Sequence, residues 1–366
     1  MKIALFIPSL DVGGAERVIL NLANGFTERG YLVDLLLCKR QGNYTYKVSN
    51  KINVINFNKE HTTGALLELI KYIWKFSPDV VISALDYVNI VVLIAKLFCR
   101  RKTRFIVSVH SNLSQSTILN NNIKNKMIPF FIKVLYRFAD RIVAVSRDVA
   151  EDLSRIIGNR KKINVVYNPI VSRNLYIRAK EPLEHKWFKD INIPVILSVG
   201  RLSYEKNLEC LIKAFKIILQ KIDVRLVILG EGNMRQNLKK MIEELKLSEF
   251  VDMPGVVENP YNYMKNASVV VLSSKYEGLP NVLIEALACN TPIVSTDCKS
   301  GPREILADGR FGYLVQVDDE NNIAKRVIDI LSGKEVKFTQ IELDSHLKQF
   351  TLDYAVDEYL KLISEV

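Results

Sequence analysis

Hydrophobic and polar positions alternate in blocks along the chain, as buried strands followed by amphipathic helices. Apolar runs in the first half predict strands at residues 2–8, 32–38, 80–83, 105–109, 141–145 and 164–167. Helical spacing appears at residues 15–29 and 148–157, and Ser146 precedes the second helix as a candidate cap. This alternation predicts a parallel, doubly wound α/β sheet.

A second series of the same kind follows a polar stretch at residues 170–192, which we interpret as a connection between domains. Its predicted strands and helices are 195–199, 207–220, 225–229, 234–245, 267–272, 280–289, 292–295 and 324–331, with a last helix from about 352. The fold class is therefore expected to be α/β with two facing Rossmann-like domains, residues 1–170 and 171–351. A ligand is expected in the cleft between them, at the carboxyl ends of the strands.

Bulk properties favour a cytosolic protein of two domains. The chain has 366 residues, of which 48% are hydrophobic and 25% charged. Its first apolar run ends at Pro8, and its most apolar stretch, residues 88–99, is shorter than the roughly 20 residues that a bilayer requires. The five cysteines contain no C-x-x-C, which argues against a disulfide framework or a zinc site.

The excess of positive charge lies entirely in the first half. Residues 1–170 carry 25 Lys and Arg against 12 Asp and Glu, whereas the remainder carries 26 against 28. This asymmetry favours an anionic membrane surface as a partner of the first domain. A solubility surface is the simpler interpretation. Nucleic acid is not expected, because no DNA- or RNA-binding motif accompanies the charge.

A candidate membrane-binding segment lies in this basic half. Residues 111–126 are polar and asparagine-rich, and predict a mobile loop. Residues 127–141, MIPFFIKVLYRFADR, combine aromatic side chains with Lys133, Arg137 and Arg141. They are either a core helix with a solvated basic stripe or an amphipathic surface for an anionic bilayer. The RRKTR run at 100–104 and Lys124 and Lys126 would add to such a surface.

Two glycines, Gly13 and Gly14, follow the first predicted strand and open a helix. Free backbone N–H groups at a helix start attract anions, and glycine lets a phosphate approach closely. The pattern is not G-x-G-x-x-G, so a nicotinamide fingerprint is absent. An ordinary turn remains an equal alternative.

Two cations and two carboxylates follow strands of the second half. Arg201 and Lys206 lie on the loop after VILSVG, where they can grip a diphosphate and stabilise a leaving group. Glu277 precedes a Gly-Leu-Pro turn that leads into a helix containing Glu285. A carboxylate can accept hydrogen bonds from two vicinal sugar hydroxyls, although a lone glutamate is usually a solvated surface residue.

His110 ends the run FIVSVH, so it is expected at the cleft edge of the first sheet. A lone histidine is more often structural than functional. Its place at the carboxyl end of a strand favours the functional interpretation.

Taken together, these strings resemble the GT-B retaining glycosyltransferases of family 4 over nearly the whole chain. The resemblance rests on PSLDVGGAERV, VSVHSN, VVYNPI, SVGRLSYEKN, LGEG, YEGLPNVLIEALA, SGPREIL and GYLV. The most specific features are the two glutamates eight residues apart and the upstream R-x4-K. The chain departs from many relatives at Ser300, where they carry a glycine before Gly301, which leaves the contacts of Arg303 and Glu304 open.

The resemblance implies a role for each matching residue. Arg201 and Lys206 would bind the donor diphosphate, Glu285 the ribose and Glu277 the transferred sugar, with His110 near the reacting carbon. Glu277, His110, Lys206 and Arg201 are thus the expected catalytic residues. The other expected donor-binding residues are Gly13, Gly14, Gly230, Glu231, Gly255, Val256, Gly278, Leu279, Pro280, Asn281, Val282 and Glu285, with Leu283 close by. The last helix would return to the first domain.

The expected activity is transfer of a hexose or N-acetylhexosamine from a UDP-sugar to a lipid-linked or surface glycan at the cytoplasmic face of the membrane. The resemblance implies retention of the anomeric configuration, with the departing phosphate oxygen deprotonating the acceptor. No cofactor is expected, and the absence of a D-x-D string favours a metal-independent reaction in which the cations replace the metal. Two alternatives stay open: a sugar-nucleotide epimerase on the same fold, and a non-catalytic nucleotide-sugar-binding subunit.

Overall fold

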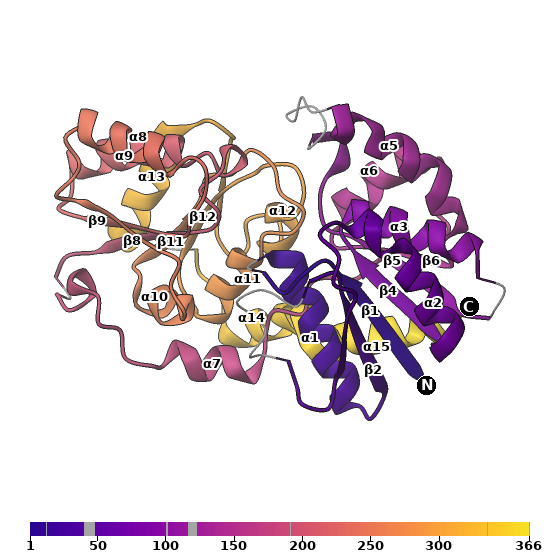
Figure 1. Ribbon diagram of the computed structural model, residues 1–366. Coiled ribbons are helices and arrows are strands. Elements are labelled where there is room, and N and C mark those ends of the chain that lie inside the picture. Colours follow the sequence, from indigo (N-terminus) through magenta and orange to yellow (C-terminus); the bar gives the residue numbers. More distant parts are fainter. Residues whose placement is uncertain are drawn as a thin grey trace. The chain divides into compact units, whose positions relative to one another are not determined.

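The chain folds into two α/β units whose elements are labelled in Figure 1. The computed structural model describes residues 1–11, 13–39, 48–99, 102–115, 123–190, 192–334 and 336–365, and of 123–126 the backbone alone. Unit 1 comprises Met1–Ile170 and Gln349–Val366, and unit 2 comprises Val171–Lys348. The predicted fold class, two Rossmann-like parallel sheets, is confirmed.

Unit 1 is built on a parallel sheet that, within the described residues, has seven strands in the order β3-β2-β1-β4-β5-β6-β7. The strands are β1 (Lys2–Ile7), β2 (Leu32–Leu37), β3 (Asn53–Asn56), β4 (Val80–Ala84), β5 (Arg104–Val109), β6 (Arg141–Ala144) and β7 (Ile163–Val165). Helices cover both faces, so the central strands read as continuous apolar runs. The strand order reverses between β1 and β4, so the carboxyl ends of these two strands form a topological switch point.

Capping residues mark both ends of one helix of unit 1, α6. The helices of this unit are α1 (Gly14–Glu28), η2 (Thr62–Ala65), α2 (Leu66–Phe76), α3 (Asp86–Leu97), α5 (Ile123–Leu135), η3 (Tyr136–Phe138), α6 (Arg147–Ile157) and α15 (Leu352–Ser364). The predicted cap Ser146 accepts a hydrogen bond from the Val149 N–H at 3.2 Å. Gly158, with φ of 69°, ends the same helix in the left-handed conformation.

The last helix, α15, belongs to unit 1 and packs against α1. A Cβ on Gly25 of α1 would lie 2.7 Å from a methyl of Val356, so glycine allows the two helices to approach closely. Arg29 forms ion pairs with Asp353 and Asp357 at the edge of the contact. At the other end of α15, Arg104 donates a hydrogen bond to the Ile363 carbonyl at 2.6 Å.

Unit 2 has, within its described part, a six-stranded parallel sheet in the order β10-β9-β8-β11-β12-β13. The strands are β8 (Val195–Val199), β9 (Arg225–Leu229), β10 (Val251–Gly255), β11 (Val269–Leu272), β12 (Ile293–Thr296) and β13 (Tyr313–Val315). The helices are α7 (Arg173–Ala179), η4 (Lys186–Phe188), η5 (Tyr204–Lys206), α8 (Leu208–Leu219), α9 (Arg235–Glu244), α10 (Pro260–Asn266), α11 (Asn281–Ala288), α12 (Pro302–Ile305), α13 (Glu320–Leu331) and α14 (Gln340–Leu347). The short helix η6 (Lys348–Phe350) begins at the last residue of unit 2 and continues into unit 1. Its switch point lies between β8 and β11.

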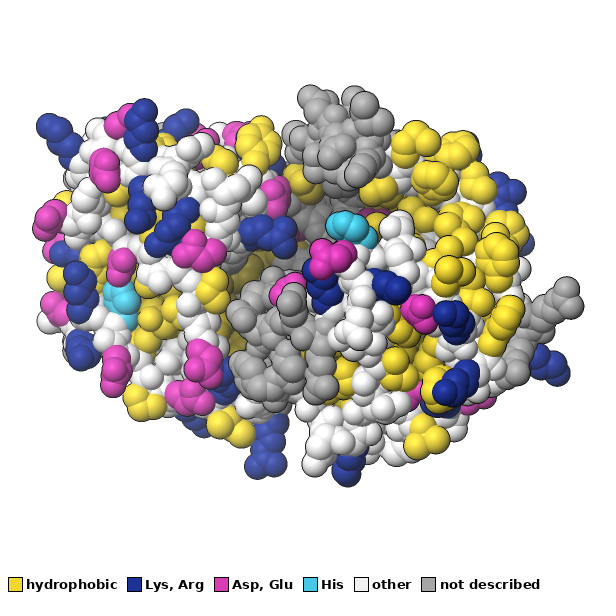
Figure 2. All heavy atoms as spheres, viewed as in Figure 1, with side chains coloured by type: hydrophobic (Ala, Val, Ile, Leu, Met, Phe, Trp, Pro, Cys, Tyr) yellow, Lys and Arg dark blue, Asp and Glu magenta, His cyan; other side chains and the backbone are white. Residues whose placement is uncertain are grey.

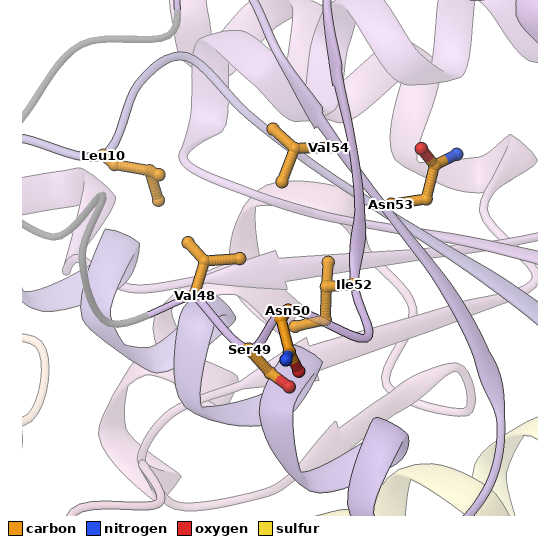
Figure 3. A pocket seen from close by; sticks show the side chains of 7 residues that line it. All are labelled: Leu10, Val48, Ser49, Asn50, Ile52, Asn53 and Val54. Carbon is orange, nitrogen blue, oxygen red and sulfur yellow. The ribbon is translucent and has the colours of Figure 1, made fainter.

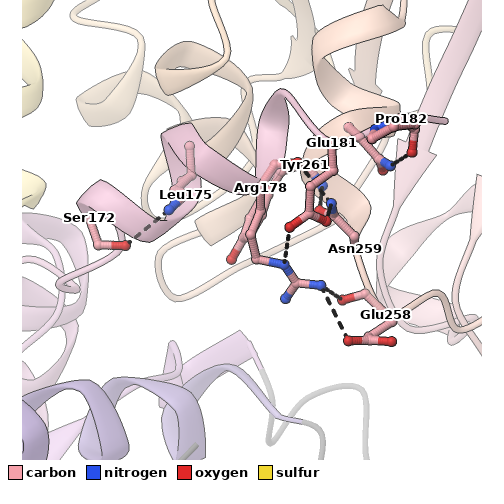
Figure 4. A network of polar contacts seen from close by, with 9 residues as sticks. Ser172, Leu175, Arg178, Glu181, Pro182, Glu258, Asn259 and Tyr261 are labelled. Atoms are coloured by element: carbon pink, nitrogen blue, oxygen red, sulfur yellow. Dashed lines mark hydrogen bonds and ion pairs between the residues drawn. The ribbon is translucent and has the colours of Figure 1, made fainter.

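Of the stretch at 170–192, interpreted above as a connection, the described residues from Val171 onward are instead part of unit 2. They include α7, which packs against α10. Figure 4 shows how Arg178 reaches from α7 to the segment that leads into α10, where it donates to the Glu258 carbonyl at 3.0 Å. Asn259 returns a hydrogen bond to the Arg178 carbonyl at 2.8 Å. The charges that suggested a linker are therefore used for packing within the unit.

The sequence pattern missed the short strands β3, β10 and β13, which lack the long apolar runs of the other strands. The loop predicted at 111–126 is also partly wrong, because α5 begins at Ile123. Residues 116–122 of that loop and the first two residues of the RRKTR run lie outside the described residues, as do the side chains of Lys124 and Lys126. Within the described ranges, no helix is both long enough and apolar enough to cross a bilayer.

Candidate functional site

In unit 2 the two predicted cations and the predicted carboxylate Glu277 follow the strands at the switch point. Arg201 and Lys206 follow β8, and Glu277 follows β11, so they leave the carboxyl ends of neighbouring strands. The Lys206 ammonium donates to Glu277 Oε1 at 2.6 Å, and the Ser274 hydroxyl donates to the same oxygen at 2.6 Å. Both side chains are largely buried, at 20% and 11% exposed. A largely buried charge pair of this kind at a strand edge can hold a polar ligand.

Arg201 is exposed, and its guanidinium forms no hydrogen bond or ion pair with the residues described. Its backbone is held because the Leu202 N–H donates to the Glu231 carbonyl at 2.9 Å. The side chain is therefore available to a ligand, while the loop beneath it is fixed. An unpaired guanidinium presents a planar fork of donors that suits a phosphate.

Two loops with predicted donor-binding residues lie beside this one. The Gly230 N–H donates to the Gly255 carbonyl at 2.8 Å, which brings the Gly230–Glu231 and Gly255–Val256 segments together. A Cβ on Gly230 would lie 1.9 Å from the Gly200 carbonyl oxygen, so only glycine fits there. Val256 is 56% exposed and follows Gly255 at the end of β10. This edge of the unit 2 sheet thus presents the backbone of the two glycine loops and the apolar side chain of Val256.

The predicted Gly-Leu-Pro turn is held by the loop after β12. A Cβ on Gly301, where φ is 100°, would lie 2.5 Å from Pro280 Cδ, so the two loops touch through glycine. Ser300 has φ of 71° and is fully buried. This is a left-handed conformation that favours glycine, and such strain concentrates at functional sites. Arg303, whose contacts the sequence left open, forms ion pairs with Asp297 and Asp308.

The helix α11 begins at Asn281, directly after this turn. Its N-cap residue Pro280 provides no side-chain cap, and the positive end of the helix dipole at this start favours an anion. Glu285 lies one turn further along and is only 4% exposed, and Leu283 is fully buried. A buried carboxylate in an apolar helix indicates a specific polar role rather than the solvated surface residue weighed above.

In unit 1 the helix α1 begins at Gly14 after the cap position Gly13, as predicted. A Cβ on Gly13 would lie 2.0 Å from a carboxylate oxygen of Glu16, so that carboxylate covers the helix start. Sequence reasoning missed this contact. An incoming phosphate would have to displace Glu16, because both are negatively charged.

His110 follows β5 in unit 1 and is half-buried. Its Nε2 lies 2.9 Å from the Ser108 hydroxyl oxygen, and its Nδ1 forms no hydrogen bond with the residues described. Burial lowers the pKa of His110 to about 4. At neutral pH the ring is therefore neutral and acts as a hydrogen-bonding group rather than as a cation.

We expect the His110 ring to titrate with a midpoint near pH 4 in the folded protein, well below the ordinary histidine value. As the pH falls from 6.5 towards 4, the unfolded chain takes up the proton first, so this group lowers the free energy of unfolding. Nuclear magnetic resonance of the ring, with His110→Gln for assignment, measures the midpoint. A midpoint at or above 6.5 would contradict the burial argument.

Sequence reasoning also missed Asp86, which begins α3 at the carboxyl end of β4. Its Oδ2 accepts a hydrogen bond from the Ser111 hydroxyl at 3.1 Å, and burial raises its pKa to about 6. The hydroxyl of Tyr136 also interacts with this carboxylate. Position directly after a strand is the signal that could have identified it.

A cavity of about 330 Å³ lies elsewhere in unit 1, and Figure 3 shows the side chains around it. It is lined by Leu10, Val48, Ser49, Asn50, Ile52, Asn53 and Val54. None of these can titrate or act as a nucleophile at neutral pH except weakly through the serine, and none is a predicted site residue. The described lining therefore carries none of the chemistry assigned above.

Comparison with known proteins matches both units to glycosyltransferase families. Residues 180–347 match the family described as "Glycosyl transferases group 1", and residues 12–172 match "Glycosyltransferase Family 4". An N-acetylgalactosamine-N,N'-diacetylbacillosaminyl-diphospho-undecaprenol 4-alpha-N-acetylgalactosaminyltransferase of Campylobacter jejuni is 34% identical over 346 residues, covering 92% of each chain. A second C. jejuni enzyme, an alpha-1,4-N-acetyl-D-galactosaminyltransferase, is 28% identical and covers 100% of this chain and 99% of its own.

Solved structures show the same fold over the whole chain. Anabaena HepE in complex with UDP superimposes with a TM-score of 0.83 at 19% identity, covering 100% of both chains. A glycosyltransferase of Rickettsia africae has a TM-score of 0.80 at 18% identity and covers 100% of this chain and 98% of its own.

Proposed function

Because the chain belongs to the family 4 glycosyltransferases, we propose that this enzyme transfers a hexose or N-acetylhexosamine from a UDP-sugar to a lipid-linked glycan. The C. jejuni relatives are named for acceptors on undecaprenol diphosphate, and they cover at least 92% of this chain. This supports an acceptor of the same chemical class here.

The arrangement at the switch point of unit 2 carries the proposal. The exposed Arg201 and the largely buried Lys206 would bind the donor diphosphate and stabilise the charge that develops as it leaves. Glu277, which Lys206 and Ser274 hold in place, would accept hydrogen bonds from hydroxyls of the transferred sugar. Glu285 would hold the ribose, and the positive end of the α11 dipole would favour the donor phosphates.

We propose that the reaction needs no divalent cation and no other cofactor. The sequence contains no D-x-D string, and Arg201 and Lys206 would neutralise the diphosphate in place of a metal. Calorimetry with UDP, GDP and ADP tests the donor: UDP should bind at least about tenfold more tightly than the others, a difference of about 1.4 kcal/mol, with EDTA present or absent. Tighter binding of GDP or ADP, or binding abolished by EDTA, would overturn this part.

The anomeric configuration is proposed to be retained, with the acceptor attacking on the face from which the diphosphate leaves. The departing phosphate oxygen would take the acceptor proton. His110 is neutral at working pH, so it would donate or accept a hydrogen bond near the reacting carbon. Proton coupling constants of the purified product give its configuration, and an inverted product would contradict this mechanism.

We further propose that unit 1 binds the cytoplasmic face of an anionic membrane through a surface of exposed aromatic residues. This aromatic surface comprises Trp74, Phe76, Phe98, Phe130, Phe131 and Phe138, each at least 40% exposed. It extends over α2, α3, α5 and η3, of which α3 contacts the other three. Figure 2 shows hydrophobic side chains gathered over this part of unit 1, with basic side chains among them.

The composition of the aromatic surface fits a lipid interface. Lys71, Lys75, Lys133 and Arg137 are exposed on the same helices, which suits anionic headgroups. Of the residues 127–138, Ile132 and Tyr136 are fully buried while the phenylalanines are exposed. The helix thus exposes aromatic as well as basic side chains, and this favours the surface interpretation over a core helix with a solvated basic stripe. Exposed aromatic patches of this kind mark interaction sites.

The double substitution Phe130→Ser and Phe131→Ser should weaken binding to vesicles that contain anionic lipid by about tenfold or more, since two apolar side chains no longer enter the bilayer. Co-sedimentation at low salt measures it. Ile341→Ser, which removes an 82% exposed apolar side chain from unit 2, is the matched control and should bind like the wild type. The membrane proposal would be contradicted if the wild-type protein did not bind vesicles that contain anionic lipid.

A further inference from the structure

The catalytic histidine proposed above is joined through one hydroxyl to the last helix of the chain. His110 Nε2 lies 2.9 Å from Ser108 Oγ, and the Tyr359 hydroxyl of α15 lies 3.4 Å from the same oxygen. Ser108 and Tyr359 are buried, at 1% and 2% exposed. All three residues belong to unit 1, although Tyr359 is 251 positions from Ser108.

The direction of these hydrogen bonds follows from what the buried phenol requires. Among the described residues, Tyr359 has no hydrogen-bond partner except Ser108. If Ser108 donated to Tyr359, the phenol's own O–H would be left buried without an acceptor, which costs about 1–3 kcal/mol. Tyr359 therefore donates to Ser108, and the serine hydrogen is left to point at His110 Nε2. A nitrogen that accepts this hydrogen bond carries no proton of its own.

We infer that Tyr359 is a positioning residue that fixes the tautomer of His110 through Ser108, so that Nδ1 carries the proton and serves as the donor to substrate. This inference rests on the proposed function, because it assigns the nitrogen that would face the transferred sugar. Nδ1 has no partner among the described residues, whereas Nε2 is engaged. The ring thus presents a single defined N–H at the carboxyl end of β5.

A second set of hydrogen bonds keeps Ser108 itself in place. Asn89 Nδ2 donates to the Ser108 carbonyl at 2.8 Å and to the Tyr136 hydroxyl at 3.0 Å. The Ser83 hydroxyl donates to Asn89 Oδ1 at 2.7 Å. These side chains are fully buried. The serine backbone is therefore held from α3 and β4, and its hydroxyl is left to connect α15 with the histidine.

Tyr359→Phe tests the inference, because it removes one hydroxyl and keeps the ring that packs edge-on against Phe26. The first readout is the ¹⁵N chemical shifts of the His110 ring. In the wild type Nδ1 should appear protonated and Nε2 unprotonated, and in the variant the two should move towards a mixture of tautomers. The second is kinetic: kcat should fall about five- to tenfold, as expected for the loss of one buried hydrogen bond, with UDP binding unchanged.

Two further variants separate positioning from folding. Tyr354→Phe changes a tyrosine of the same helix that is 43% exposed, and it should leave shifts and kcat as in the wild type. Ser108→Ala should lower kcat at least as much as Tyr359→Phe, and the double variant no further, because both break one connection.

The inference fails if the His110 shifts of Tyr359→Phe match those of Tyr354→Phe, or if the wild type carries its proton on Nε2. It also fails if the wild type transfers sugar and the Tyr359→Phe variant has the same kcat. Absence of any sugar transfer by the wild type would instead refute the proposed function, while the resonance measurement still decides the tautomer.

Discussion

Replacing Lys206 with alanine is expected to lower sugar transfer by about 100- to 1,000-fold, the range seen when one preorganised electrostatic donor is removed. The substitution removes a cation that lies beside the proposed diphosphate position and breaks its 2.6 Å contact with Glu277. It also leaves the largely buried Glu277 carboxylate without its cation. Steady-state kinetics with the identified donor measures the loss, and Glu277→Gln should show a comparable one.

The control for Lys206→Ala is Lys216→Ala, which removes an exposed lysine from α8 in the same unit. It should retain wild-type activity, and all three variants should keep the wild-type circular dichroism spectrum. Binding of UDP should weaken in Lys206→Ala but not in Lys216→Ala. If Lys206→Ala transferred sugar at more than about a tenth of the wild-type rate, the lysine would not be the main stabiliser of the leaving group.

The second large effect is expected for Gly230→Ala. Gly230 has φ of 135°, and its Cβ would lie 1.9 Å from the Gly200 carbonyl oxygen. Backbone strain of this kind costs about 1–3 kcal/mol before the clash is counted, so the free energy of unfolding of unit 2 should fall by at least about 3 kcal/mol. The loop of Gly230 and Glu231 should move as well, and binding of UDP should be lost at temperatures where the variant is still folded.

A matched control for this change exists in the same unit. Gly333 also has a positive φ, 79°, but nothing lies within 4 Å of its added Cβ. Gly333→Ala should therefore cost only the strain of the left-handed conformation, about 1 kcal/mol. Urea unfolding of both variants separates the two terms. Equal losses in the free energy of unfolding would mean that the clash of the added Cβ with the Gly200 carbonyl costs nothing.

Much of the fold was predictable because the central strands are continuous apolar runs. The runs at 195–199 and 225–229 are strands β8 and β9 with those bounds. β13 has only three residues and two of them are half-buried, so its pattern does not differ from that of a loop. The segment 170–192 misled because its charges suggest a linker, whereas Arg178 uses its charge to fix α7 on unit 2.

The part of the candidate site that could be predicted from the sequence consists of residues that follow strands. Arg201, Lys206 and Glu277 each follow a strand, and parallel strands bring their carboxyl ends to one edge. The hydroxyl of Tyr359 beside Ser108 was not predictable, because tertiary packing alone brings together residues 251 positions apart. The position of the Glu16 carboxylate over Gly13 was likewise not predictable, because it depends on the side-chain rotamer rather than on the spacing of residues in the sequence.

The most direct test of the central claim is release of nucleoside diphosphate from UDP-, GDP- and ADP-sugars with and without polyprenyl-diphosphate glycans in detergent. We predict acceptor-dependent release from a UDP-sugar that survives EDTA and is lost in Lys206→Ala and Glu277→Ala. Interconversion of the sugar nucleotide without an acceptor would instead indicate an epimerase. Donor binding with no release from any donor, even with fresh extracts of lipid-linked sugars as acceptors, would contradict the transferase and indicate a binding subunit.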